Sequence, residues 1–162
     1  MRVCFIGHRT VTRSEELVSA LKETVVKLIE KGVCTFLFGS MSEFNDLSRE
    51  IVAELRNEYP HIKRIYVRSA YQHIDASYEE YLLKLYEETY FPNKIERAGK
   101  YSYVERNFEM IDNADFCVFY YNENYIPLSN RAANRNTKRN SGTGIAYEYA
   151  LKKKKEIINL YR

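Results

Sequence analysis

Short runs of consecutive apolar residues alternate along the chain with longer stretches in which apolar residues recur every three or four positions. The first pattern is typical of strands buried on both faces, and the second of amphipathic helices. The predicted strands cover residues 2–6, 33–38, 62–67, 115–121 and 156–160. The predicted helices run from Ser14 to Gly32, from Ser42 to about Tyr59, and over residues 76–90, 101–113 and 142–153, with Ser14 and Ser42 as N-caps.

This succession of elements predicts a Rossmann-like α/β fold with three layers, α/β/α. Because the strands are nearly continuous in apolar residues, the sheet is expected to be parallel and covered on both faces. Right-handed crossovers then favour five strands in the order 3-2-1-4-5, numbered along the chain. No linker or internal repeat divides the sequence, so residues 1–162 are predicted to form one domain. Ligands of such sheets bind beyond the carboxyl ends of the strands.

The segment Ser141, Gly142, Thr143 and Gly144 opens the last predicted helix. Two glycines at a helix start let a phosphate approach the backbone, where free N–H groups and the positive end of the helix dipole hold it. The segment therefore predicts a site for a nucleotide or another phosphorylated ligand. The alternative is a plain helix start, with Ser141 as N-cap and the glycines serving turn geometry.

Three further loops leave predicted strand ends with residues suited to the same ligand. They are Gly7, His8 and Arg9, then Gly39, Ser40, Met41 and Ser42, and finally the tract near Arg68. Arg9 can bind phosphate in a bidentate manner and His8 can hydrogen-bond a ligand, but Arg9 can equally be solvated and His8 can instead bond a neighbouring carbonyl. The convergence of four loops at one edge of the sheet is the stronger argument for a binding site.

Arg106 and Glu148 are the candidate residues on helices. Tyr103 and Met110 flank Arg106 at helical spacing, and an arginine framed in this way indicates a pocket wall or a subunit contact. The alternative is a solvated arginine whose aliphatic stem lies over Tyr103 and Met110. The stripe of this helix that is expected to face the core contains Val104, Phe108 and Ile111. Glu148 lies one turn beyond the glycine loop, where it can face a bound ligand or pair with Lys152.

Composition narrows the classes of protein to consider. The chain has 162 residues, 45% of them apolar, without a long apolar segment or a signal-peptide pattern, so a cytoplasmic protein with no membrane span is expected. Buried free thiols are expected at Cys4, Cys34 and Cys117, and the scattered histidines predict no metal site. No cofactor is expected.

Two kinds of macromolecular partner are considered, nucleic acid and a second copy of the chain. The net charge of +3 does not by itself indicate nucleic acid. One polar loop nevertheless gathers four basic residues, Arg131, Arg135, Lys138 and Arg139. Apolar surface beyond what one sheet contact can bury, on the tyrosine-rich helix 76–90 or on the helix of Arg106, predicts a homodimer.

Four segments together resemble the SLOG superfamily, the Rossmann-like group that includes DNA-processing protein A and the LOG-type phosphoribohydrolases. They are F-I-G-H-R at residues 5–9, F-G-S-M-S-E-F-N-D-L at 38–47, E-R-N-F-E-M-I-D-N-A-D at 105–115 and S-G-T-G-I-A-Y-E-Y-A-L-K-K at 141–153. The resemblance covers nearly the whole chain, which looks most like a bacterial and prophage branch of that group.

LOG-type enzymes take an arginine from an R-x-x-x-M segment and a glutamate from a G-G-x-G-T-x-x-E segment, and Arg106 and Glu148 occupy the matching positions. The resemblance implies that Arg106 holds phosphate or ribose and that Glu148 assists cleavage of an N-glycosidic bond. The chain departs from this pattern at Ser141, Ile145, Asn45 and Asn107, the last of which replaces a lysine. These departures bear on catalysis more than on fold or ligand class.

Three functions are therefore weighed. The first is binding of a nucleotide or nucleotide-derived ligand, as a sensor or a sequestering protein. The second is a nucleoside 5′-monophosphate phosphoribohydrolase, and the third is single-stranded nucleic-acid binding through the basic loop. Candidate ligand-binding residues are Gly7, His8, Arg9, Gly39, Ser40, Asn107, Ser141, Gly142, Thr143 and Gly144, and candidate catalytic residues are Arg106 and Glu148.

Overall fold

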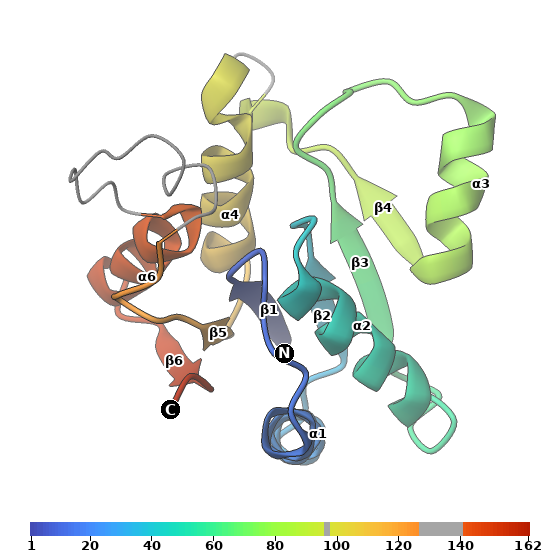
Figure 1. Cartoon of the computed structure of the whole chain (residues 1–162). Coiled ribbons are helices and arrows are strands. Elements are labelled where there is room, and N and C mark those ends of the chain that lie inside the picture. Colours follow the sequence, from blue (N-terminus) through green and yellow to red (C-terminus); the bar gives the residue numbers. More distant parts are fainter. Residues whose placement is uncertain (96–97, 127–140) are drawn as a thin grey trace.

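The computed structural model describes residues 1–95, 98–126 and 141–162, and its centre is a parallel sheet (Figure 1). Within these residues the sheet has six strands in the order β4-β3-β2-β1-β5-β6, and every neighbouring pair is parallel. The strands are β1 (Arg2–Gly7), β2 (Thr35–Phe38), β3 (Lys63–Val67), β4 (Glu88–Tyr90), β5 (Phe116–Tyr120) and β6 (Glu156–Asn159). The Rossmann-like α/β fold predicted from the pattern is confirmed.

Helices connect the strands, and side chains cap most of their N-termini. They are α1 (Glu15–Glu30), α2 (Glu43–Leu55), α3 (Ala76–Leu85), α4 (Ser102–Asp112) and α6 (Gly142–Lys152), with short 3-10 turns η1 (Asn93–Ile95) and η2 (Gly99–Tyr101). The capping side chains are Ser14, Ser42, Asp75 and Ser141. Each accepts a hydrogen bond from the backbone N–H of the residue three positions further along the chain. Each such cap satisfies one of the N–H groups that a helix start leaves unpaired. None of the helices in the described ranges is long and apolar enough to cross a membrane.

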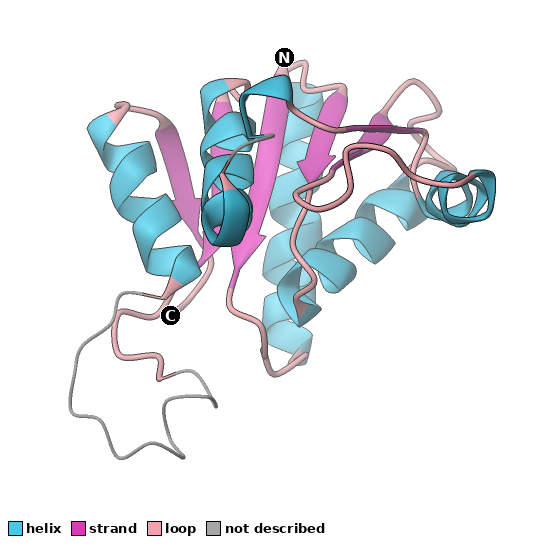
Figure 2. Ribbon diagram, turned by 90° about the horizontal axis from the view of Figure 1, so that it is seen from above, coloured by secondary structure: helices cyan, strands magenta, loops and turns pink. Residues whose placement is uncertain are grey.

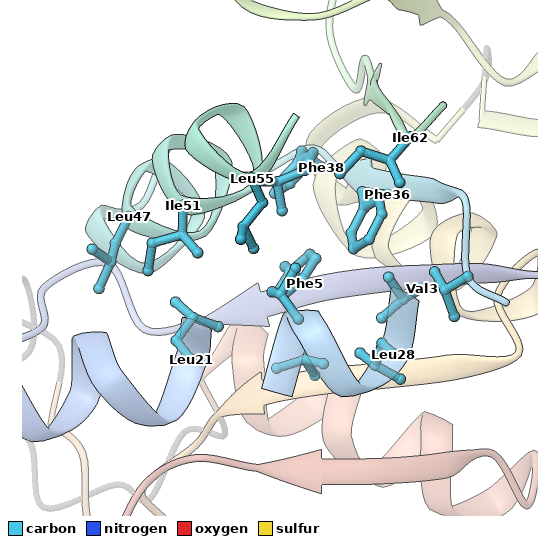
Figure 3. Packing of buried hydrophobic residues seen from close by; sticks show 14 of the residues in the cluster. Val3, Phe5, Leu21, Leu28, Phe36, Phe38, Leu47, Ile51, Leu55 and Ile62 are labelled. Carbon is cyan, nitrogen blue, oxygen red and sulfur yellow. The ribbon is translucent and has the colours of Figure 1, made fainter. Parts of the chain in front are cut away.

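Successive strand residues point to opposite faces of the sheet, which gives the protein two cores. Phe5, Phe36 and Phe38 face α1 and α2, where they pack among Leu21, Leu28, Leu47, Ile51 and Leu55 (Figure 3). The opposite core, toward α4 and α6, contains Cys4, Ile6, Leu37, Cys117, Phe119, Met110, Ile111, Ala146 and Ala150. Figure 2 shows helices on both sides of the sheet, as a buried parallel sheet requires. Cys4 and Cys117 are buried free thiols as expected, whereas Cys34 is only partly buried.

The edge of the sheet differs from the prediction. The five predicted strands keep the order 3-2-1-4-5, but a sixth strand, β4, extends the sheet beside β3. The helix predicted over residues 76–90 therefore ends at Leu85, and its last residues are extended.

An ion-pair cluster explains why this segment leaves the helix. Glu87 accepts hydrogen bonds from the backbone N–H and the guanidinium of Arg64, both at 2.6 Å, and from Arg56 at 2.7 Å. Arg64 is on β3 and Arg56 follows α2, so the carboxylate is held between two distant elements. Helical periodicity along residues 76–90 carries no information about this tertiary contact, and the sequence-based boundary was wrong for that reason.

Candidate functional site

A cavity of about 590 Å³ opens at the carboxyl ends of β1, β2 and β3, beside the point where the sheet order reverses between β1 and β5. Such a switch point is where open α/β sheets bind ligands. The N-terminal residues of α6 and the loop that leads into α2 both line this cavity. Of the sequence candidates, the lining includes Gly7, His8, Arg9, Gly39, Ser40, Arg106, Asn107, Ser141, Gly142 and Thr143.

Arg106 lies at the floor of the cavity and is only 4% exposed. Its Nη1 donates to the carbonyl oxygen of Gly39 and, at 3.4 Å, to that of Val67, while Nε donates to Asn107 Oδ1 at 3.0 Å. The side chain therefore bridges the carboxyl ends of β2 and β3. Burial lowers the pKa of Arg106 to about 10, so the guanidinium is still charged at neutral pH. Among the described residues no carboxylate forms an ion pair with it.

The helix of Arg106 presents a different face to the core from the one predicted. Its buried residues are Arg106, Asn107, Met110 and Ile111, whereas Val104 and Phe108 are only half-buried. Phe108 stacks on Tyr149 of α6 at 3.9 Å between ring centroids. The residues of α4 that face the core differ from the predicted ones because the helix packs against both the sheet and α6. The sequence pattern of one helix does not show which apolar residues face which neighbour.

The helix α6 begins at Gly142, with Ser141 as its N-cap. Ser141 Oγ accepts the N–H of Gly144 at 3.1 Å and so caps the helix. The N–H groups of Gly142 and Thr143 belong to the first turn, which has no acceptor inside a helix. A β-carbon at Gly142 would lie 3.2 Å from the ring of Tyr103, which also lines the cavity. Gly144 lies against Tyr121 and is outside the cavity lining.

A second helix start faces the same cavity. Ser42 caps α2 by accepting the N–H of Asn45 at 3.1 Å, and Ser40 hydrogen-bonds Ser42 at 2.9 Å. Asn45 Oδ1 in turn accepts the N–H of Gly39 at 3.1 Å. A β-carbon at Gly39 would lie 2.6 Å from the side chain of Arg106. Glycine at this position is therefore required by the buried arginine.

The loop after β1 supplies one buried and one exposed candidate. His8 is 1% exposed, stacks on Tyr125 at 3.9 Å and accepts the N–H of Asn122 at Nε2, at 2.8 Å. Nε2 also lies 3.2 Å from the carbonyl oxygen of Asn122, but in the shorter contact the amide N–H can only donate, so we infer that the proton of the neutral ring is on Nδ1. Burial lowers the pKa of His8 to about 4. Arg9 is exposed at the cavity. Gly7 makes room for the ring of Phe44, because a β-carbon at position 7 would lie 2.3 Å from that ring.

Two buried polar atoms of the described residues lack a hydrogen-bond partner, and both belong to residues that line this cavity. They are His8 Nδ1 and Arg68 Nε. Buried polar groups are nearly always paired in folded proteins, so the exceptions mark places where a ligand can supply the partner. The sequence pointed to the tract of Arg68 without selecting the residue.

Sequence reasoning selected no tyrosine as a ligand contact, and two of the residues that it did select, Gly144 and Glu148, lie outside the lining. Five tyrosines line the cavity, Tyr66, Tyr71, Tyr78, Tyr103 and Tyr125, and the count of 15 tyrosines was the available signal. Glu148 is exposed on α6 outside the lining. The basic cluster at residues 131–139 falls outside the described residues. The described ranges contain no group of three or more residues with side chains suited to holding a metal ion.

Comparison with known proteins places this architecture in a family. No curated protein matches the sequence. A family model, YpsA, described as the YspA SLOG family, matches residues 8–153. The match spans all four loops at the cavity apart from Gly7, and it agrees with the parallel α/β sheet. The chain therefore belongs to the YspA SLOG family, a group with a nucleotide-related Rossmann-like fold.

Proposed function

We propose that this protein binds a nucleotide or a nucleotide-derived phosphorylated ligand in the cavity at the carboxyl ends of β1, β2 and β3. The observation that carries the proposal is the buried charge of Arg106, which forms no ion pair with a carboxylate of the described residues. A buried guanidinium is costly unless an anion accompanies it. Arg106 Nη2 has no protein acceptor in the described ranges, so this atom is available to an anionic group in the cavity.

The start of α6 is the proposed position of that anion. Gly142 and Thr143, whose first-turn N–H groups have no acceptor inside the helix, line the cavity, and α6 adds the positive end of its dipole. The start of α2 contributes less, because the N–H of Glu43 already donates to the carbonyl oxygen of Arg9 and the acids Glu43 and Asp46 lie in its first turn. Arg9 is at the rim, where a guanidinium can clamp a phosphate in two contacts. Three positive features, Arg106, Arg9 and the start of α6, favour phosphate over a singly charged carboxylate.

The tyrosines favour a nucleoside attached to the phosphate. Tyr103 is 47% exposed and lies beside Gly142, and Tyr71 is 74% exposed at the opposite loop. Exposed aromatic faces next to a phosphate site suit base stacking. A cavity of about 590 Å³ falls within the usual range for small-molecule sites.

Binding is proposed in preference to cleavage. In the enzyme alternative the carboxylate of Glu148 acts on the glycosidic bond, but this residue does not line the cavity. Incubation with nucleoside monophosphates and measurement of free base tests this directly. We expect no release of base, and Glu148→Gln should bind as tightly as the wild type. Turnover that is lost in Glu148→Gln would establish the enzyme instead.

The binding proposal is tested by calorimetry with the four nucleoside 5′-monophosphates. Arg9→Ala should weaken binding about tenfold, because it removes a charge-assisted contact from an exposed side chain that supports no packing. The matched control is Arg13→Ala, which removes an exposed arginine paired with Glu50 and outside the cavity. Failure of every monophosphate to bind, or equal losses in the two variants, would contradict the proposal.

A further inference from the structure

A second hollow of about 310 Å³ adjoins the large cavity. The two hollows share Ser69, Ala70 and Tyr71, which form the loop after β3. The other residues that line the second hollow are Gln72 of the same loop, then Phe91, Ile95 and Gly99 between β4 and α4, and Ser102 at the start of α4. The two hollows are therefore neighbours, with this loop between them.

Arg68 is at the junction of the two hollows. It lines the large cavity, while its guanidinium carbon lies 6.0 Å from the centroid of the Phe91 ring in the second hollow. Its Nη1 donates to the carbonyl oxygens of Tyr71 at 2.8 Å and Gln72 at 3.2 Å. On the other edge of the guanidinium, Nε is buried without a hydrogen-bond partner and Nη2 has no acceptor among the described residues. This is the edge with which arginine binds phosphate through two parallel hydrogen bonds.

The loop that separates the hollows has a strained backbone. Tyr71 has a φ of 62°, which is unfavourable for a residue other than glycine, and its side chain is 74% exposed. Both carbonyl oxygens of this turn are bound by Arg68. Strain of this kind persists where the surroundings enforce it and is concentrated at functional sites. Arg68 thus shapes the turn with one edge and leaves the other edge unpaired.

The second hollow has the chemistry of a nucleoside site. Phe91, Ile95 and Tyr71 provide apolar and aromatic surface, and Ser69, Gln72 and Ser102 provide hydroxyl and amide groups. A base needs a surface for stacking together with a few polar groups at its edge, and a ribose needs hydroxyl partners.

We propose that the ligand is a dinucleotide. Its first nucleotide occupies the large cavity, its second nucleoside occupies the second hollow, and the free edge of Arg68 binds the phosphate that joins them. The inference rests on the proposed nucleotide binding and adds the length of the ligand and the residue that selects it.

The test compares three adenosine probes by calorimetry on the full chain. They are adenosine 5′-monophosphate, the 3′–5′-linked dinucleotide pApA and diadenosine 5′,5′-pyrophosphate. At least one dinucleotide should bind about tenfold or more tighter than the monophosphate, because the second contact becomes intramolecular. The probe that gains affinity identifies the linkage.

Two variants assign the gain to the residues named. Arg68→Lys keeps the charge and a donor for the turn but loses the two-contact edge, so it should reduce the dinucleotide advantage about tenfold. Ser102→Leu, which fills the second hollow, should reduce the same ratio independently of Arg68. Arg49→Lys is the matched control, because this half-buried arginine is on α2 outside both hollows. It should leave all three affinities unchanged.

The outcomes separate this inference from the proposed function. Binding of the monophosphate without any gain for either dinucleotide would overturn the inference alone, as would a gain that survives both variants. Absence of binding for all probes would overturn both proposals. An oligonucleotide of about twelve adenosines that binds more tightly than either dinucleotide, with a steep salt dependence, would show a nucleic-acid chain as the ligand and also overturn it.

Discussion

Replacing Arg106 with methionine separates a ligand-binding arginine from a purely structural one. The change removes the charge and keeps an unbranched side chain of similar reach in a buried position. A pKa lowered from 12.5 to about 10 means that keeping the guanidinium charged costs the folded state about 3 kcal/mol, at about 1.4 kcal/mol for each pKa unit. Methionine removes that cost.

Loss of hydrogen bonds opposes this gain. The guanidinium donates to the carbonyl oxygens of Gly39 and Val67 and to Asn107, and bonds from charged groups contribute about 1.5–3 kcal/mol each, with the 3.4 Å contact to Val67 contributing least. The two effects nearly cancel, so the unliganded variant should lose less than about 2 kcal/mol of unfolding free energy. Its melting temperature should then fall by less than about 6 °C.

Nucleotide binding should respond much more strongly. Removing a buried charged partner of a phosphate costs about 2 kcal/mol or more, so the dissociation constant for nucleoside monophosphates should rise at least about 30-fold. A ligand at about 100 times its dissociation constant stabilises the wild type by about 2.7 kcal/mol, and the same ligand concentration should stabilise the variant by only about 0.9 kcal/mol or less. Thermal unfolding with and without ligand, together with calorimetry, measures both quantities.

The control is Arg64→Met, which is equally buried but paired with Glu87 and outside the cavity. It leaves a partly buried carboxylate without its closest partner, so it should destabilise the protein more than Arg106→Met while nucleotide affinity stays unchanged. The reasoning is refuted if Arg106→Met loses about 4 kcal/mol or more of unfolding free energy and still binds nucleotides normally. A loss of that size is typical of a broken buried ion pair.

Three further predictions follow from the same geometry. His8 has a pKa lowered to about 4, so below pH 6.5 the unfolded chain binds more protons than the folded protein, and up to about 3 kcal/mol of stability should be lost as the pH falls from 6.5 to 4. His8→Gln should remove this part of the dependence of unfolding free energy on pH, measured by denaturant titrations, and an unchanged dependence would refute the assignment. Gly39→Ala should displace the side chain of Arg106, because its β-carbon would lie 2.6 Å away. The variant should lose more binding free energy for nucleotides than unfolding free energy, and normal affinity in calorimetry would contradict this. The exposed Tyr81 of α3 is proposed to form a homodimer contact, so Tyr81→Lys should give a monomer in analytical ultracentrifugation, whereas a monomeric wild type at micromolar concentration would disprove the dimer.

Much of the site could be located from the sequence, because strand ends and helix starts are local features. Ten of the twelve selected residues line one cavity, and all but Arg106 and Asn107 of α4 come from strand ends, loops or a helix start whose position follows from the order of the strands. Glu148 and Gly144 do not line it, because facing a ligand depends on the rotation of α6 about its axis. That rotation is set by contacts such as the stacking of Tyr149 on Phe108, which no periodicity within one helix reveals.

The sequence by itself determined the parallel α/β architecture, the order of the five predicted strands and the caps of α1, α2 and α6. Each of these depends on hydrophobic period, on a capping side chain or on the handedness of connections, all of which act over short stretches of chain. Only the tertiary structure decided the edge strand β4, the depth of Arg106 and the unpaired edge of Arg68. These depend on groups far apart in the chain, such as Glu87 between Arg64 and Arg56 or Arg106 beneath Gly39, because burial and electrostatic pairing are set by which elements meet in space.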